Sequence, residues 1–145
     1  MKKVLIITSS IDGTVDYILK KYDGIADFCR LDVDMFSQYE IVLDGNGKWM
    51  ISCDEWILEK GEVYSIYYRK PRLPELDEYS HEYRGMIAKD IISLINGIVD
   101  DFQGRVLTKP YILRKAENKA FQLLYAGKKS LLIPKSFVGN SNKRA

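Results

Sequence analysis

The apolar run at residues 4–7 (VLII) constrains the fold more than any other feature of the chain. It shows no alternation of apolar and polar positions, which is typical of a strand buried on both faces, as in a parallel sheet covered by helices. Apolar residues at helical spacing follow, with Asp12 or Thr14 as the expected N-cap, and residues 26–33 (ADFCRLDV) form the next strand. A strand, a helix and a second strand predict a right-handed crossover, and therefore an α/β domain.

A turn-forming segment then separates two short β-rich runs. Residues 41–43 (IVL) and 49–51 (WMI) flank residues 44–48 (DGNGK), whose Asp-Gly and Asn-Gly pairs are typical of an antiparallel hairpin. Residues 63–70 (VYSIYYRK) alternate in the manner of a strand, which ends before two prolines. The expected architecture is a central, mostly parallel sheet with an added β-hairpin and flanking helices.

The second half of the chain begins with its longest helix candidate, residues 80–102. Its apolar stripe is wider than one face of a small domain requires, so the helix is either deeply buried or shared with a partner chain, as in a homodimer. Both interpretations stay open. The elements expected after it are a strand at 105–107, one helix with an apolar stripe over 113–124, strands at 130–133 and 137–138, and a frayed end at 140–145.

Composition excludes several classes of protein. The 145 residues fit one domain, and a net charge of +2 from 22 basic and 20 acidic residues argues against a nucleic-acid or membrane-surface protein. Cys29 and Cys53 lack metal-ligand spacing and are typical of reduced thiols. The first apolar run is too short for a signal peptide or a membrane span, so we expect a cytoplasmic protein.

Basic residues accumulate towards the end of the chain. After Asp101 only Glu117 opposes ten lysines and arginines. Such a run forms either a solvated helix face with a tail, or a surface that faces an anion such as phosphate or an acidic peptide. The sequence does not decide between these two interpretations.

No set of residues predicts catalysis by this chain alone. His81, the single histidine, stands where a helix begins, and no phosphate-binding GxxxxGK[ST] pattern occurs. The carboxylate pairs Asp32 with Asp34 and Asp100 with Asp101 lack identifiable partners for a metal. We therefore assign no catalytic residue and no metal ligand.

Arg69 is the strongest candidate for binding. It lies at the end of a predicted strand, beside Lys70 and Arg72, where its planar guanidinium can be presented to a carboxylate or phosphate. The alternative is a structural ion pair with a surface acid such as Glu75. We predict that Arg69 and Arg72 bind substrate.

Three segments together resemble a known family. The first strand (VLIIT), the strand end YYRKP and the segment AENKAFQLLYA with LLIPKSF are similar to the ATP-grasp ligases that modify ribosomally made peptides, the microviridin and graspetide maturases. The resemblance implies a small Rossmann-like pre-ATP-grasp domain at residues 1–112. It also implies that residues 113–145 form a linking helix and strand that lead towards an ATP-grasp core outside this sequence.

The resemblance implies a function for the complete enzyme. Such a ligase uses ATP and magnesium to form ester or amide cross-links in a precursor peptide through an acyl phosphate. This chain would then be its substrate-side domain, bind no cofactor itself and be inactive alone. Asn118, Lys119 and Gln122 would dock against the core. The alternative is a stand-alone, non-catalytic binding or regulatory module with the same fold, and a complete small enzyme is the weakest option because no catalytic set assembles.

Overall fold

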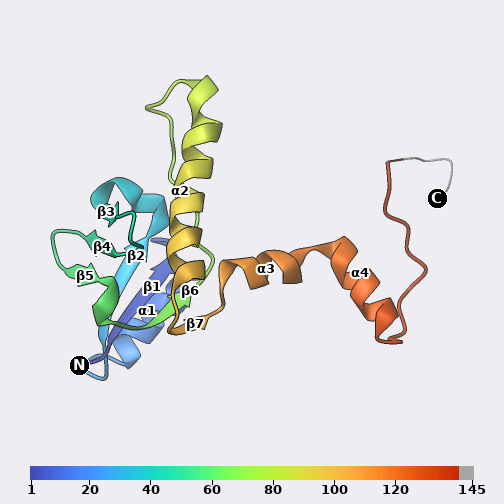
Figure 1. The fold of residues 1–145 in the computed structure, drawn as a ribbon, viewed down its shortest axis with the longest axis horizontal. Coiled ribbons are helices and arrows are strands. Elements are labelled where there is room, and N and C mark those ends of the chain that lie inside the picture. The colour runs from blue at the N-terminus through green and yellow to red at the C-terminus, as the bar shows by residue number, and fades with distance from the viewer. Residues whose placement is uncertain (141–145) are drawn as a thin grey trace. The chain divides into compact units, whose positions relative to one another are not determined.

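The computed structural model describes residues 1–140. The chain divides into two compact units, Met1–Pro110 and Tyr111–Ala145, and each is described here by itself (Figure 1). The sequence analysis predicted the boundary between these two parts after residue 112.

A four-stranded sheet lies at the centre of the first unit, in the order β2-β1-β6-β7. Every pair of neighbours is parallel, which confirms the predicted α/β class. The central strand β1 places Leu5 opposite Cys29 on one side and Ile66 on the other. The bounds of the strands are Lys3–Thr8 (β1), Asp27–Asp32 (β2), Val63–Tyr68 (β6) and Arg105–Leu107 (β7).

Both faces of this sheet are covered, as the unbroken apolar run predicted. Leu5 and Ile7 belong to the main core cluster and are fully buried. Ile6 points to the opposite face because successive side chains alternate along a strand, and it is also buried. Helix α1 (Gly13–Lys21) buries Val15 and begins at the N-cap Asp12, one of the two predicted caps.

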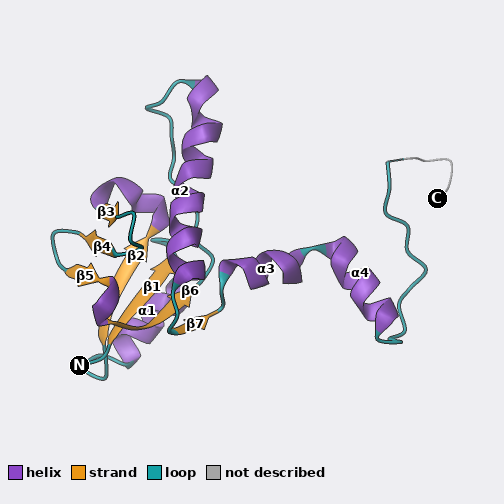
Figure 2. Ribbon diagram, in the orientation of Figure 1, coloured by secondary structure: helices purple, strands orange, loops and turns teal. Residues whose placement is uncertain are grey.

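A second, antiparallel sheet holds the predicted hairpin (Figure 2). Strands β3 (Glu40–Leu43) and β4 (Trp49–Ser52) pair across a turn in which the Asp44 carboxylate accepts hydrogen bonds from two backbone amides of the turn. The sequence missed a third strand, β5 (Ile57–Glu59), which pairs with β4. It also missed two short 3-10 helices, η1 (Val33–Gln38) and η2 (Lys60–Glu62).

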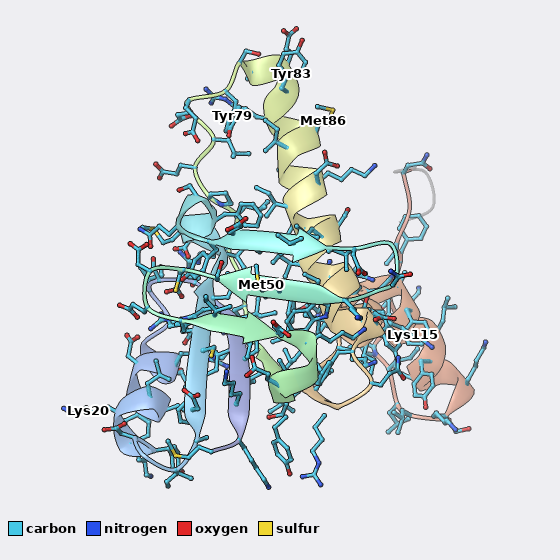
Figure 3. The ribbon with its side chains drawn as sticks, turned by 60° about the vertical axis from the view of Figure 1, so that its left-hand side comes forward. Lys20, Met50, Tyr79, Tyr83, Met86 and Lys115 are labelled. Carbon is cyan, nitrogen blue, oxygen red and sulfur yellow. The ribbon has the colours of Figure 1, made fainter. Side chains whose placement is uncertain are left out.

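Helix α2 (His81–Asp101) differs between its two halves. Its buried residues, Ile91, Ile95, Ile98 and Val99, all lie in the second half and join the core cluster. The first half projects beyond the sheets and exposes Tyr83 and Met86 (Figure 3). Burial therefore accounts for the apolar stripe from Ile91 onward, whereas before it Ile87 is only partly buried and Tyr83 and Met86 stay exposed.

The second unit corrects part of the prediction. The single helix expected around residues 113–124 is two helices, α3 (Pro110–Glu117) and α4 (Lys119–Lys128), because Asn118 caps α4 and interrupts the run. No strand forms at 130–133 or 137–138, since these residues pair with no other described segment. The frayed end expected at 140–145 lies outside the described residues, apart from Asn140.

None of the helices in residues 1–140 is suited to cross a bilayer. Neither α2, with its 21 residues, nor any other helix in this part of the chain combines the length and the apolarity that crossing a membrane requires.

Candidate functional site at the carboxyl ends of β1 and β6

A polar cavity of about 370 Å³ opens where β1 and β6 end and α1 begins. The carboxyl ends of parallel strands are the usual place for ligands in open α/β sheets. The segments that follow β1 and β6 both line it, so the parallel pairing of the two strands creates the site. The lining residues are Ser9, Ile11, Asp12, Gly13, Thr14, Arg69, Lys70 and Arg72.

Asp12 organises the floor of this cavity. One carboxylate oxygen, Oδ1, accepts hydrogen bonds from the backbone amides of Thr14 and Val15 at 3.1 and 3.4 Å and so caps α1. The other oxygen, Oδ2, accepts from the Thr8 hydroxyl at 2.9 Å and from Arg69 Nε at 2.9 Å. A single carboxylate thus joins the end of β1, the start of α1 and the segment after β6.

The ionised form of Asp12 is favoured in spite of its burial. Burial by itself raises the pKa of this carboxyl, because the charged form loses hydration. Hydrogen bonds from Thr8 and Val15 and the positive charge of Arg69 outweigh that effect, and the pKa lies below its ordinary value of 3.8. Asp12 is therefore an ionised partner for Arg69 at neutral pH, and it is unsuited to act as a general base there.

Arg69 is held rigidly in the cavity. Besides the bond to Asp12, its Nη2 donates to the Thr14 hydroxyl at 3.0 Å, and its backbone amide donates to the Ile7 carbonyl at 2.8 Å. The ion pair anticipated with Glu75 is thus made with Asp12 instead. A guanidinium has five N–H donors, so these bonds fix its orientation and leave donors for a bound anion.

Two further cations complete the rim of the cavity. Lys70 has a φ of +44°, in the left-handed region that residues with a side chain seldom adopt, and it turns the chain away from β6. Lys70 and Arg72 are exposed and form no ion pair within residues 1–140. Because Asp12 already offsets Arg69, these two residues give the cavity its net positive charge and suit it to a carboxylate or phosphate.

The carboxylates considered as metal ligands have other partners. Asp34 accepts from the backbone amide and the hydroxyl of Ser10, at 2.8 and 2.6 Å. Asp32 pairs with Arg30 at 2.8 Å; burial raises the pKa of Asp32, and Arg30 opposes that rise. Across residues 1–140, no three His, Cys, Asp or Glu side chains gather as a metal site would require.

A second polar cluster, around Arg30, was missed by the sequence analysis. Arg30 also pairs with Asp16 at 2.6 Å and donates to the Ser9 carbonyl oxygen at 2.9 Å. Arg30 and Asp32 stand two positions apart on β2 and so share a face, a spacing from which their pairing could have been predicted. The cluster joins β2 to α1 and to the segment that lines the cavity.

The residues predicted to dock against an ATP-grasp core lie in the second unit and interact with one another. The Asn118 side chain accepts from the Phe121 amide at 2.9 Å. Lys119 Nζ donates to Gln122 Oε1 at 3.3 Å, and the Gln122 side-chain amide donates to the Ala116 carbonyl oxygen. The bond from Gln122 joins the end of α3 to the start of α4, and the other two lie within α4 and its cap. The docking role stays a prediction.

The chain was then compared with known proteins. It matches no protein-family model and no curated protein sequence. Among solved structures it resembles the macrocyclase MdnC of Microcystis aeruginosa MRC, bound with the precursor peptide MdnA, at a TM-score of 0.80 and 27% identity over 91% of this chain and 45% of that one.

Two other structures agree with this match. The macrocyclase MdnB of the same organism gives a TM-score of 0.77 and 26% identity over 92% of this chain and 46% of that one. A RiPP-associated ATP-grasp ligase of Chryseobacterium gregarium, in complex with ADP and a leader and core peptide, gives 0.74 and 21% over 92% and 43%. RiPP denotes a ribosomally made, modified peptide.

The chain spans less than half the length of each of these proteins. The match therefore concerns one α/β portion of larger enzymes, consistent with an N-terminal domain. The resemblance predicted from the sequence is confirmed: the chain has the fold of the pre-ATP-grasp portion of the ATP-grasp ligases that mature ribosomally made peptides.

Proposed function

We propose that this chain is the substrate-side domain of an ATP-dependent ligase that forms ester or amide cross-links in a ribosomally made peptide. In the complete enzyme, a side-chain carboxylate of the peptide would take a phosphoryl group from ATP. A hydroxyl or amine of the same peptide would attack the acyl phosphate, form the ring and release phosphate. ATP and Mg²⁺ would be bound by polypeptide outside residues 1–140.

The similarity to MdnC carries this proposal, because it extends over 91% of the chain and that macrocyclase is bound with a precursor peptide. The cationic cavity adds independent support. Ring formation starts from carboxylates, and a site with net positive charge is complementary to acidic side chains of a peptide substrate.

Within this function, Arg69 and Arg72 hold an acidic side chain of the peptide. Arg69 is fixed by Asp12 and Thr14, so its remaining donors lose little freedom when a carboxylate binds. Arg72 is exposed and lies on the rim, where it can close on the bound group. Both act by binding and orienting the peptide, and neither forms or breaks a bond.

The proposal includes a homodimer in the cytoplasm. The projecting half of α2 exposes Tyr83 by 52% and Met86 by 57%, and exposed aromatic and methionine side chains are typical of protein interfaces. Sedimentation equilibrium tests the dimer, since replacement of both residues by serine should shift a dimer towards monomer. A wild-type chain that sediments as a monomer contradicts this part.

The activity is tested by mass spectrometry. The protein translated from the full reading frame that contains these codons is mixed with the precursor peptide encoded nearest to it. We expect the peptide to lose one water per cross-link, only with ATP and Mg²⁺, while residues 1–145 alone leave its mass unchanged. Peptide binding without any mass loss would instead support the non-catalytic module.

Peptide binding by the cavity is tested by calorimetry on the same protein. Arg72→Ala should weaken binding by about 1.5–3 kcal/mol, the range for a hydrogen bond to a charged group. Arg105→Ala is the matched control, because Arg105 opens β7 at the opposite, amino-terminal edge of the parallel sheet. Equal losses in the two variants, or none in either, would remove Arg72 from the peptide site.

A further inference from the structure

A second cavity, of about 620 Å³, opens beside the cationic site. Its walls come from η1, from the segment that follows Arg72 and from residues 87–91 of α2. Eight of its thirteen lining residues are apolar, and the others are Asp34, Ser37, Arg72, Glu75 and Glu78. The apolar lining residues are Met35, Phe36, Leu73, Pro74, Leu76, Tyr79, Ile87 and Ile91.

The two cavities adjoin. Arg72 lines both of them. The hydrogen bonds from Ser10 to Asp34 tie η1, on the apolar side, to the segment after β1 that lines the cationic side. A carboxylate bound by Arg72 would therefore lie between the two cavities.

The apolar cavity has a fixed floor and an open rim. Phe36, Leu76 and Ile87 are partly buried and pack against the main core cluster, so the core holds the floor in place. Met35 and Leu73 are 38% and 42% exposed, so apolar surface remains to be covered at the rim. Burying such surface is favourable in proportion to its area.

Charge is distributed unequally over the pair of cavities. Lys70 lies on the cationic side alone and Arg72 at the border, whereas the carboxylates of Asp34, Glu75 and Glu78 line the apolar cavity. Asp34 accepts hydrogen bonds from Ser10, and Glu75 and Glu78 form no ion pair within residues 1–140. A carboxylate is therefore favoured on the first side. On the second side an uncharged side chain is favoured over another carboxylate, because like charges repel at close range.

We infer that the two cavities together recognise a peptide segment in which an acidic residue stands next to a bulky apolar residue. The acidic side chain binds at Arg69, Lys70 and Arg72, and the apolar side chain covers Met35 and Leu73. This inference rests on the proposed function and deepens it by naming the class of substrate segment.

The probe is a set of four blocked peptides that differ only at two central residues: Glu-Leu, Glu-Ser, Gln-Leu and Glu-Glu. Each is titrated into the ¹⁵N-labelled chain of residues 1–145, and dissociation constants follow from amide shifts. We expect Glu-Leu to bind most tightly. Replacing Leu by Ser should weaken binding about tenfold, and replacing it by Glu should weaken binding further.

Variants at the rim locate the effect. Leu73→Ser and Met35→Ser should reduce the preference for Glu-Leu over Glu-Ser to within about twofold, while the preference for Glu-Leu over Gln-Leu persists. Ile57→Ser is the matched control, because Ile57 is 62% exposed on the separate antiparallel sheet, and it should change neither preference. Amide dispersion in the same spectra shows that each variant is folded.

The outcomes separate this inference from the proposed function. Equal binding of Glu-Leu and Glu-Ser overturns the inference and leaves the carboxylate site intact. If Glu-Leu binds more tightly than Glu-Ser but no more tightly than Gln-Leu, the cationic cavity does not bind a carboxylate. The inference that the two cavities recognise an acidic and an apolar residue together is then wrong as well. If no peptide shifts the amides of either cavity, the carboxylate site and the inferred pairing are both wrong. The mass-spectrometric assay of the full reading frame still decides the ligase activity separately.

Discussion

The two units of the chain differ in where their apolar residues lie. In Met1–Pro110, two sheets and half of α2 enclose a cluster of fully buried side chains, among them Leu5, Ile51 and Ile95. Over residues 111–140 no side chain is buried, although the segment carries Leu124, exposed by 67%, and other large apolar residues.

The difference shows that the first unit is stabilised by its own core, whereas the second unit lacks one. The first unit has its own core, and a core of this kind supports cooperative folding. The helices of the second unit have 8 and 10 residues, lengths that are marginal in water without tertiary packing. We therefore expect the second unit to gain stability only when other polypeptide covers it.

The largest expected effect contrasts truncations in the two units. Ile95→Ala leaves a cavity in the core of the first unit and should lower the free energy of unfolding by about 2–5 kcal/mol. Leu124→Ala removes exposed surface and should change it by less than about 0.5 kcal/mol. Urea unfolding followed by circular dichroism measures both. Similar losses in the two variants would show that the units share one core.

The next effect concerns Asp12, which joins three elements of the first unit. Asp12→Ala removes a helix cap and leaves Arg69 without its ion-pair partner, so we expect a loss of about 2 kcal/mol in the free energy of unfolding. Asp77→Ala is the control, because Asp77 is 79% exposed in its pair with Arg84 and should lose less than about 1 kcal/mol. Urea unfolding again provides the measurement.

The ion pair between Asp12 and Arg69 also predicts how the free energy of unfolding depends on pH. The pKa of Asp12 is lower in the folded than in the unfolded chain, so its contribution is complete above 3.8 and is lost as the pH falls below that value. The difference between wild type and Asp12→Ala should therefore shrink in acid. A difference that stays constant down to pH 2 would show that the charge of Asp12 is not what stabilises the fold.

Thiol reactivity sharpens the comparison further. Cys29 is 3% exposed, and burial raises its pKa to about 11, whereas Cys53 is half-buried. At pH 8 an alkylating reagent should modify Cys53 first and Cys29 only as the first unit opens. Mass spectrometry of residues 1–110 alone should give the same Cys29 rate as the full chain, and a faster rate would mean that the second unit protects this core.

The smallest effect lies in the second unit. Asn118→Ala removes the cap of α4 and should weaken that helix by about 1 kcal/mol, without changing the unfolding of the first unit. Amide exchange, measured residue by residue, separates the two responses. Faster amide exchange or lost cooperativity in the first unit would argue against its independence.

Local patterns predicted most of the first unit. The unbroken run in β1, the Asp12 cap and the Asp-Gly and Asn-Gly turn each carry a signal within a few residues, and the structure confirms all three. Strand β5 has three residues, too few for a recognisable period, and pairing with β4 alone defines it. The missed break at Asn118 shows that an apolar stripe can continue across two helices.

The candidate site was predicted only in part. Arg69 and Arg72 stood out because they follow a strand, yet their surroundings involve Thr8 and Asp12, more than fifty residues away in sequence. The sequence analysis gave Glu75 only as an example of a surface acid that could pair with Arg69. The parallel pairing of β1 with β6 brings Asp12 closer, and nothing in the local sequence records that distance.

The sequence by itself determined the α/β class, the cap of the first helix and the family resemblance, because each depends on the order of neighbouring residues. Only the tertiary structure decided which acid pairs with Arg69, which half of α2 is buried and where the apolar cavity meets the cationic one. These features arise from contacts between residues far apart in the chain, whose energies depend on how whole elements pack.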